Sequence, residues 1–176
     1  MTFSKTLFSA MVIGAFIASP VYAKDTTMTS AEIGSLATVA AVDKNETLIA
    51  VVALNKKLSQ DINDFANMMI DQHGSNLTQI LSMMNDTQPL TGGDSDKMTA
   101  NGKKALMKLG AMNGDAFATA YVNAMVNGHE AVLKLIDDQL MKTATSPEVK
   151  QFLTNTRKTV AIHLAHAKKL QDKMKS

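Results

Sequence analysis

Residues 60–85 read QDINDFANMMIDQHGSNLTQILSMMN. Apolar side chains recur every three or four positions in this stretch, at Phe65, Ala66, Met69, Leu77 and Ile80. Such spacing places them on one face of an α-helix. His73 falls in the same series, so the stretch predicts an amphipathic helix that turns one histidine towards the interior of the protein.

Three other stretches, at about 30–58, 115–141 and 147–173, show the same helical periodicity, and none shows the alternation of a half-buried strand. Thr29 and Glu32 form a capping-box pattern before the first of them. Ser146 and Pro147 supply a cap and a first helical residue for the last. Lys56 and Lys57 are expected at the negative end of the first helix dipole. The sequence therefore predicts an all-α protein.

The connections between these helices predict how they are arranged. Helices one and two, and helices three and four, are joined by a few residues and must be antiparallel neighbours. Residues 86–114 form a long crossover between helices two and three, and within it 95–109 predict a short accessory helix. We therefore expect an antiparallel four-helix bundle with one long crossover.

The first residues have the features of a secretory signal. Lys5 precedes an apolar run at 7–17, and a small residue, Ala23, ends the segment. The run is too short to span a bilayer, which takes about 20 apolar residues. We expect residues 1–23 to be cleaved, 24–29 to be an extension and 30–176 to be one helical domain, periplasmic or secreted and without a membrane anchor.

Composition narrows the function further. The 176 residues contain no cysteine, which excludes disulfides, thiolate metal sites and a lipid-bearing cysteine. Cleavage removes Lys5 and lowers the formal net charge from +2 to +1. An exported, nearly neutral protein is not expected to bind nucleic acid. The sequence leaves open whether the protein forms a homo-oligomer or binds another protein of the envelope.

His129 and His163 also fall in apolar helical series, so three helices each turn one histidine inward. On the first helix, Glu46 lies on an apolar line, with Asp43 as the other acid available there. At about 1.5 Å per residue, Glu46 and His73 lie roughly 18 and 21 Å from the turn that joins their helices, and His129 and His163 roughly 18 and 24 Å from theirs. All four groups should therefore meet near the middle of the bundle.

Two interpretations of this group stay open. Three neutral imidazoles and one carboxylate suit a single transition-metal ion such as zinc, copper, nickel or iron. Alternatively, the same groups form a buried hydrogen-bonded network that only sets the packing. His166 is a further candidate ligand through its His-x-x-His spacing, and Met69 and Met125 are candidate soft ligands for copper(I), although edge and core positions are their more ordinary roles.

We expect the metal interpretation to describe a non-enzymatic protein that buffers metal or supports stress tolerance in the envelope. The alternative is an interaction or structural bundle without metal. An oxidoreductase or hydrolase with an open metal position is a third hypothesis, but the sequence holds no nucleophile or acid–base motif outside the histidine group.

Short motifs in the sequence also resemble a known family. These are ALNKKLS at 53–59, FANMMIDQH at 65–73 with Asn76 and Leu77 behind it, the positions Phe117, Tyr121 and His129, and SPEVK at 146–150 leading to His163 and Leu164. Over about 31–170 they resemble the exported bacterial proteins of domain of unknown function family 4142. One position departs from the family pattern as we know it, because Ala118 stands where an acid usually follows the phenylalanine.

The resemblance implies a ferritin-like four-helix bundle in the bacterial envelope and no established activity. The residues themselves argue against ferroxidase chemistry. A di-iron carboxylate bundle needs Glu-x-x-His on two helices. Ile70, Val126 and Val160 stand three positions before the three histidines. The sequence therefore predicts a single metal ion at most.

Overall fold

The computed structural model describes residues 28–84 and 90–175, and every regular element in these ranges is helical. The elements are α1 (Ser30–Leu54), α2 (Gln60–Met83), α3 (Ser95–Gly110), α4 (Gly114–Leu135), the π-helical turn η1 (Ile136–Leu140), α5 (Met141–Thr143) and α6 (Pro147–Lys173). The all-α prediction is confirmed. The predicted signal peptide, residues 24–27 and part of the crossover lie outside the described residues.

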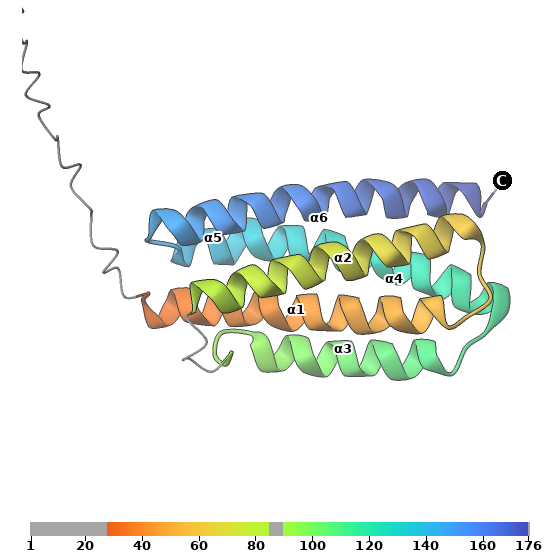
Figure 1. Ribbon diagram of the computed structural model, residues 1–176, viewed down its shortest axis with the longest axis horizontal. Helices are drawn as coiled ribbons and strands as arrows, with labels where there is room; N and C mark the ends of the chain where they lie inside the picture. Colours follow the sequence, from red (N-terminus) through yellow and green to blue (C-terminus); the bar gives the residue numbers. More distant parts are fainter. Residues whose placement is uncertain (1–27, 85–89, 176) are drawn as a thin grey trace, which may run out of the picture.

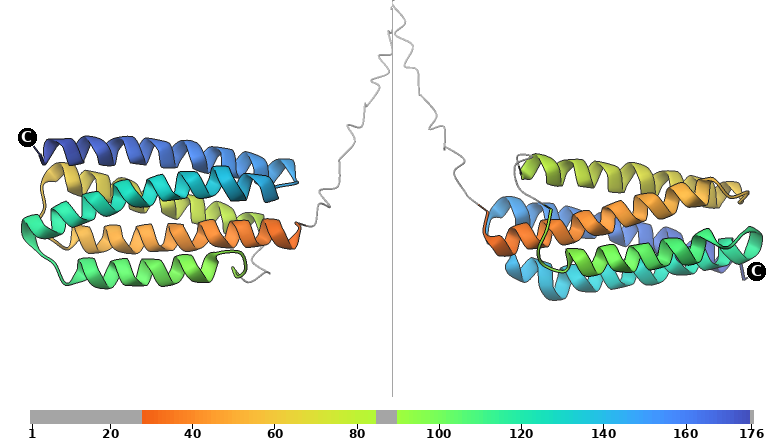
Figure 2. Two further views of the ribbon diagram at one scale, coloured as in Figure 1. Left: turned by 180° about the vertical axis from the view of Figure 1, so that it is seen from behind. Right: turned by 90° about the horizontal axis from the view of Figure 1, so that it is seen from below.

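The five long helices lie lengthwise beside one another, and successive ones run in opposite directions (Figure 1). α1 packs along both α2 and α3, α4 packs along α6, and α2 also contacts α6 (Figure 2). No helix in the two described ranges has the length and apolar content that crossing a membrane requires.

α3 confirms the short helix predicted at 95–109, and it is held against α1. The Asn45 side chain donates a hydrogen bond to the Met98 carbonyl over 2.8 Å. Just before α3, Gly93 has a φ of +56°, and a Cβ there would lie 2.6 Å from the Gly34 carbonyl oxygen. Only glycine fits this close approach without strain.

The first helix ends earlier than predicted. α1 stops at Leu54 rather than Leu58, and the Asn55 side chain donates to the Val51 carbonyl over 2.8 Å. Lys56 consequently lies beyond the helix and donates to the carbonyl of Gly110, over 3.1 Å, at the end of α3. Lys56 and Lys57 thus directly follow the end of α1, and the Lys56 side chain also bonds to Asn113 Oδ1 over 3.0 Å.

The third predicted helix is not one continuous α-helix. α4 is followed by the π-helical turn η1 and then by the single turn α5. A π turn adds a residue to one helical turn and so changes the face on which later residues lie. At the other predicted ends, the capping box of Thr29 and Glu32 is present, and the Ser146 side chain accepts a hydrogen bond from the Val149 amide.

The apolar core is divided into two clusters along the helix axes. One cluster gathers around Phe65, Phe117 and Tyr121, and the other around Leu36, Ile136 and Phe152. Between their members, α1, α2, α4 and α6 all carry buried polar side chains. This polar layer consists of Asp43, Glu46, His73, His129, Thr156 and His163.

Candidate metal centre

The three inward-facing histidines meet in the polar layer. His73, His129 and His163 come from α2, α4 and α6 and are only 4%, 2% and 0% exposed. Their ring centroids are 5.0 to 5.9 Å apart. One nitrogen of each ring lies within 4.8 Å of the corresponding nitrogens of the other two. These three buried histidines are therefore close enough together to hold a metal ion.

The outer nitrogen of each ring is hydrogen-bonded to an acceptor. His73 Nδ1 lies 2.8 Å from Asp43 Oδ1, and His129 Nδ1 lies 2.7 Å from the carbonyl oxygen of Met125. His163 Nε2 lies 2.8 Å from Gln72 Oε1. Each acceptor assigns a proton to the nitrogen it faces, because a carboxylate, a carbonyl and an amide oxygen accept and do not donate.

The inner nitrogens consequently carry lone pairs in the neutral rings. These atoms are Nε2 of His73, Nε2 of His129 and Nδ1 of His163, and none has a hydrogen-bond partner among the described residues. An unprotonated nitrogen with its opposite nitrogen held by an acceptor is the usual state of a metal-ligating histidine. The outer contacts thus orient three lone pairs before any ion binds.

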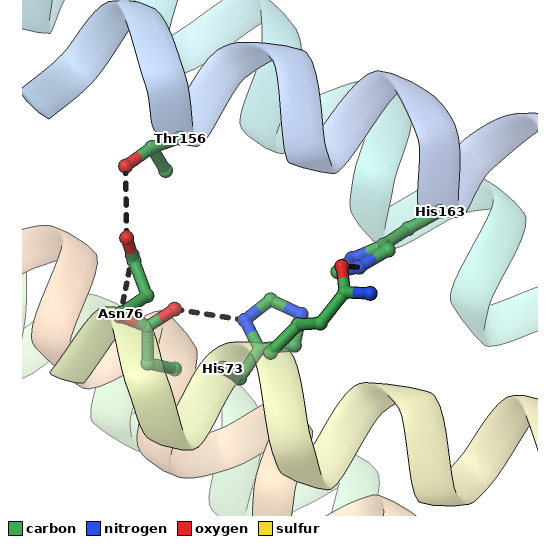
Figure 3. A network of polar contacts seen from close by, with 6 residues as sticks. His73, Asn76, Thr156 and His163 are labelled. Carbon is green, nitrogen blue, oxygen red and sulfur yellow. Dashed lines mark hydrogen bonds and ion pairs between the residues drawn. The ribbon is translucent and has the colours of Figure 1, made fainter. Parts of the chain in front are cut away.

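Further hydrogen bonds hold Asp43, the partner of His73, in place. Asn76 donates to Asp43 Oδ2 over 2.9 Å, and the Thr156 hydroxyl donates to Asn76 Oδ1 over 3.1 Å. Figure 3 shows Thr156, Asn76 and His73 along this chain, which passes through Asp43 on α1. Gln72 and Asn76 were not predicted as site residues, and Asp43 was predicted only as an alternative acid to Glu46.

Burial keeps two of the rings neutral. It lowers the pKa of His129, and it lowers the pKa of His163 to about 3, in the latter case with help from the neighbouring imidazoles. Burial alone would also lower the pKa of His73, but the Asp43 carboxylate raises it above its ordinary value. At neutral pH the centre therefore offers deprotonated nitrogens on His129 and His163, and His73 is the ring on which a proton competes with a metal.

Glu46 lies beside the histidines but outside their group. It is 9% exposed, and its Oε2 atom has no hydrogen-bond partner among the described residues. Its charge acts to raise the pKa of both His73 and His129. Burial, and then the charge of Glu46, also raise the pKa of Tyr121, whose buried hydroxyl lacks a described partner as well.

The remaining candidate ligands are His166, Met69 and Met125. His166 is exposed and lines a surface pocket of about 270 Å³ together with Asp61, Asp64 and Lys169. Met69 and Met125 are buried members of the apolar cluster around Phe65. The backbone carbonyl of Met125 faces His129 Nδ1 over 2.7 Å.

A family model described as "Domain of unknown function (DUF4142)" matches residues 18–170 of the chain. No curated protein and no solved structure matches.

Proposed function

Since the chain belongs to the family described as "Domain of unknown function (DUF4142)", a description without an activity, we propose a function from the geometry of the polar layer: the protein binds one transition-metal ion. His73, His129 and His163 supply the nitrogen ligands, and the unpartnered carboxylate of Glu46 lies beside them. We place this protein in the periplasm or outside the cell, where it buffers the metal or supports stress tolerance without acting as a ferroxidase.

The observation that carries this proposal is that three buried histidines bring ligand atoms within 4.8 Å of one another, while Nε2 of His73, Nε2 of His129 and Nδ1 of His163 have no hydrogen-bond partner among the described residues. An internal hydrogen-bonded network needs a donor for every acceptor. Here the three outer protons are already engaged with Asp43, Met125 and Gln72. Each buried polar atom left without a partner costs about 1 to 3 kcal/mol. A metal cation satisfies all three nitrogens at once, which a network among the rings alone does not.

The ligand set restricts which ion fits. Imidazole nitrogens suit zinc, copper, nickel and iron, whereas magnesium and calcium prefer oxygen ligands. A hydrogen bond from a ligating histidine to a carboxylate, as between His73 and Asp43, is typical of zinc centres. A second ion would need carboxylates three positions before the histidines, where the chain has Ile70, Val126 and Val160 instead.

The same arrangement supports a ferritin-like interpretation of the fold. α1, α2, α4 and α6 contribute every residue of the polar layer, and α3 contributes none. We propose that these four helices are the core bundle and that α3, packed outside on α1, belongs to the crossover.

The test is a metal-dependent change in thermal stability. An ion that binds only the native state at about 100 times its dissociation constant adds about 2.7 kcal/mol to the free energy of unfolding. For a domain of this size, that raises the melting temperature by about 5 to 10 °C. We expect Zn²⁺ added to chelator-treated, untagged mature protein to produce this rise, and EDTA to reverse it.

Mg²⁺ is the matched control and should leave the melting temperature unchanged. The proposal is wrong if Zn²⁺, Cu²⁺, Ni²⁺ and Fe²⁺ all leave it unchanged. In that case His163→Leu should keep or raise the melting temperature, since replacing a merely structural buried polar group by an apolar one is often neutral or stabilising. That result would support the alternative, a bundle whose inner polar groups only set the packing.

The hydrogen bond between Asp43 and His73 leads to a separate prediction. Asp43→Asn keeps an acceptor for His73 and lets Asn76 and Thr156 reverse their hydrogen bonds, so it removes mainly the charge. Asp43→Ala removes the acceptor as well. Loss of such outer partners typically costs 10 to 100-fold in metal affinity. Competition titrations with a chelating indicator should show about a tenfold loss for Asn and about a hundredfold loss for Ala.

Asp71→Asn is the control, because Asp71 is an exposed aspartate two residues before His73. It should bind metal as the wild type does. Equal affinities for all four proteins would show that Asp43 does not support a ligand.

A further inference from the structure

Glu46 is a buried carboxylate whose position the histidine ligands do not explain. Its Oε1 atom lies 3.6 Å from the place where a Cβ of Gly128 would stand, an ordinary van der Waals distance, so the carboxylate reaches α4 beside His129. Its Oε2 atom has no partner among the described residues. A buried carboxylate without a partner is costly, so Oε2 needs a hydrogen-bond donor or a cation.

The carboxylate is nevertheless set back from the coordination group. Among the described acidic and histidine side chains, the group of three or more that could share one metal ion consists of His73, His129 and His163, whose ligand atoms lie within 4.8 Å of one another. Glu46 is not a member of this group, although its charge influences both His73 and His129. The carboxylate therefore lies near the three histidines without belonging to their ligand group.

We infer that the ion held by the three histidines keeps a fourth coordination position for a small exogenous ligand, and that Glu46 accepts a hydrogen bond from this ligand. The inference rests on the proposed function. Zinc bound by three protein ligands commonly takes water in a fourth, open position. A divalent ion balances the charges of Asp43 and Glu46, so neutral water is the resting ligand and a small anion such as azide can replace it.

The centre is also close to solvent on one side. His163 is fully buried, yet its Nε2 atom donates to the side chain of Gln72, which is exposed on α2. This hydrogen bond joins the buried ring on α6 to a side chain on α2 that solvent reaches.

The experiment uses mature protein loaded with one equivalent of Co²⁺, whose visible absorption reports its coordination. Azide titration should change the wild-type spectrum. Glu46→Gln should still bind one Co²⁺ and should bind azide at least about tenfold more tightly, because it removes a like charge beside the anion. Glu130→Gln, which removes an exposed carboxylate on the same helix, should behave as the wild type does.

The outcomes separate this inference from the proposed function. A Co²⁺ spectrum that azide leaves unchanged overturns the inference, and so does equal azide affinity in the wild type and Glu46→Gln. If Glu46→Gln weakens Co²⁺ binding a hundredfold, the carboxylate ligates directly and the centre is closed, although a metal protein remains. Failure of every variant and of the wild type to bind Co²⁺, Zn²⁺ or Cu²⁺ contradicts the proposed function itself.

Discussion

Mature protein carrying His129→Ala is expected to retain less than about a tenth of a metal ion per chain under conditions in which the wild type retains one. Structural zinc binding is worth about 10 to 16 kcal/mol, so each of the three histidine ligands contributes at least about 3 kcal/mol. Loss of that amount weakens affinity by more than about a hundredfold. His129 is the α4 member of the group of three nitrogens. Elemental analysis after gel filtration measures the effect.

His166→Ala is the matched control for this variant. It makes the same chemical change on α6, three residues after His163, but at an exposed position. It should keep one ion per chain and the full thermal shift with Zn²⁺. Equal metal contents in the wild type and His129→Ala would show that the ion, if bound, lies elsewhere.

The level at which the histidines meet could be predicted from the sequence because helix geometry is nearly constant. A rise of about 1.5 Å per residue converts the distance from a turn directly into a height. His73, His129 and His163 lie near the middle of helices whose turns were correctly placed to within a few residues. In the structure the three imidazole rings accordingly meet, with their centroids 5.0 to 5.9 Å apart.

The roles of the two acids on α1 could not be predicted in the same way. Asp43 and Glu46 are three residues apart and therefore share a face. A rotation of the helix by a few tens of degrees decides which one reaches His73. Periodicity does not determine that rotation, which depends on packing against α2 and α3. The structure assigns Asp43 to the hydrogen bond with His73 and leaves Glu46 Oε2 without a partner.

Contacts between helices were missed for the same reason. Gln72 reads as a surface residue from its place in the sequence, and it is exposed, yet it bonds to His163 on α6. Glu32 was correctly predicted as part of the capping box of the first helix. Its second role, at the start of α6, depends on how the first and last helices come together and has no signature in either segment.

Glu32 is the residue from which the largest loss of stability is expected. It is 1% exposed, and its Oε2 atom accepts hydrogen bonds from the amide and hydroxyl of Thr29. Its Oε1 atom accepts from the amides of Thr145 and Ser146, over 2.9 and 2.7 Å. One carboxylate therefore caps the start of α1 and holds the segment that begins α6.

Glu32→Gln should lower the free energy of unfolding at pH 7 by about 3 kcal/mol, because one amide nitrogen then faces donors that lose their acceptor. The melting temperature should fall by about 10 °C. Chemical denaturation at pH 7, in the presence of EDTA to exclude metal effects, measures the difference. Glu148→Gln, an exposed substitution in the first turn of α6, should cost less than about 1 kcal/mol.

The same variant has a defined pH dependence. Burial by itself would raise the pKa of Glu32, but the amides of Ser146, Thr29 and Thr145 hold it far below its ordinary value of 4.5. A carboxyl whose pKa is depressed by folding stabilises the protein fully above the unfolded-state value and loses that contribution as the pH falls. The stability difference between wild type and Glu32→Gln should therefore shrink by about 1.6 kcal/mol between pH 4.5 and 3. The other carboxylates titrate in both proteins and cancel in the comparison, so a difference that stays constant over this interval would show that the charge of Glu32 does not join the two helix ends.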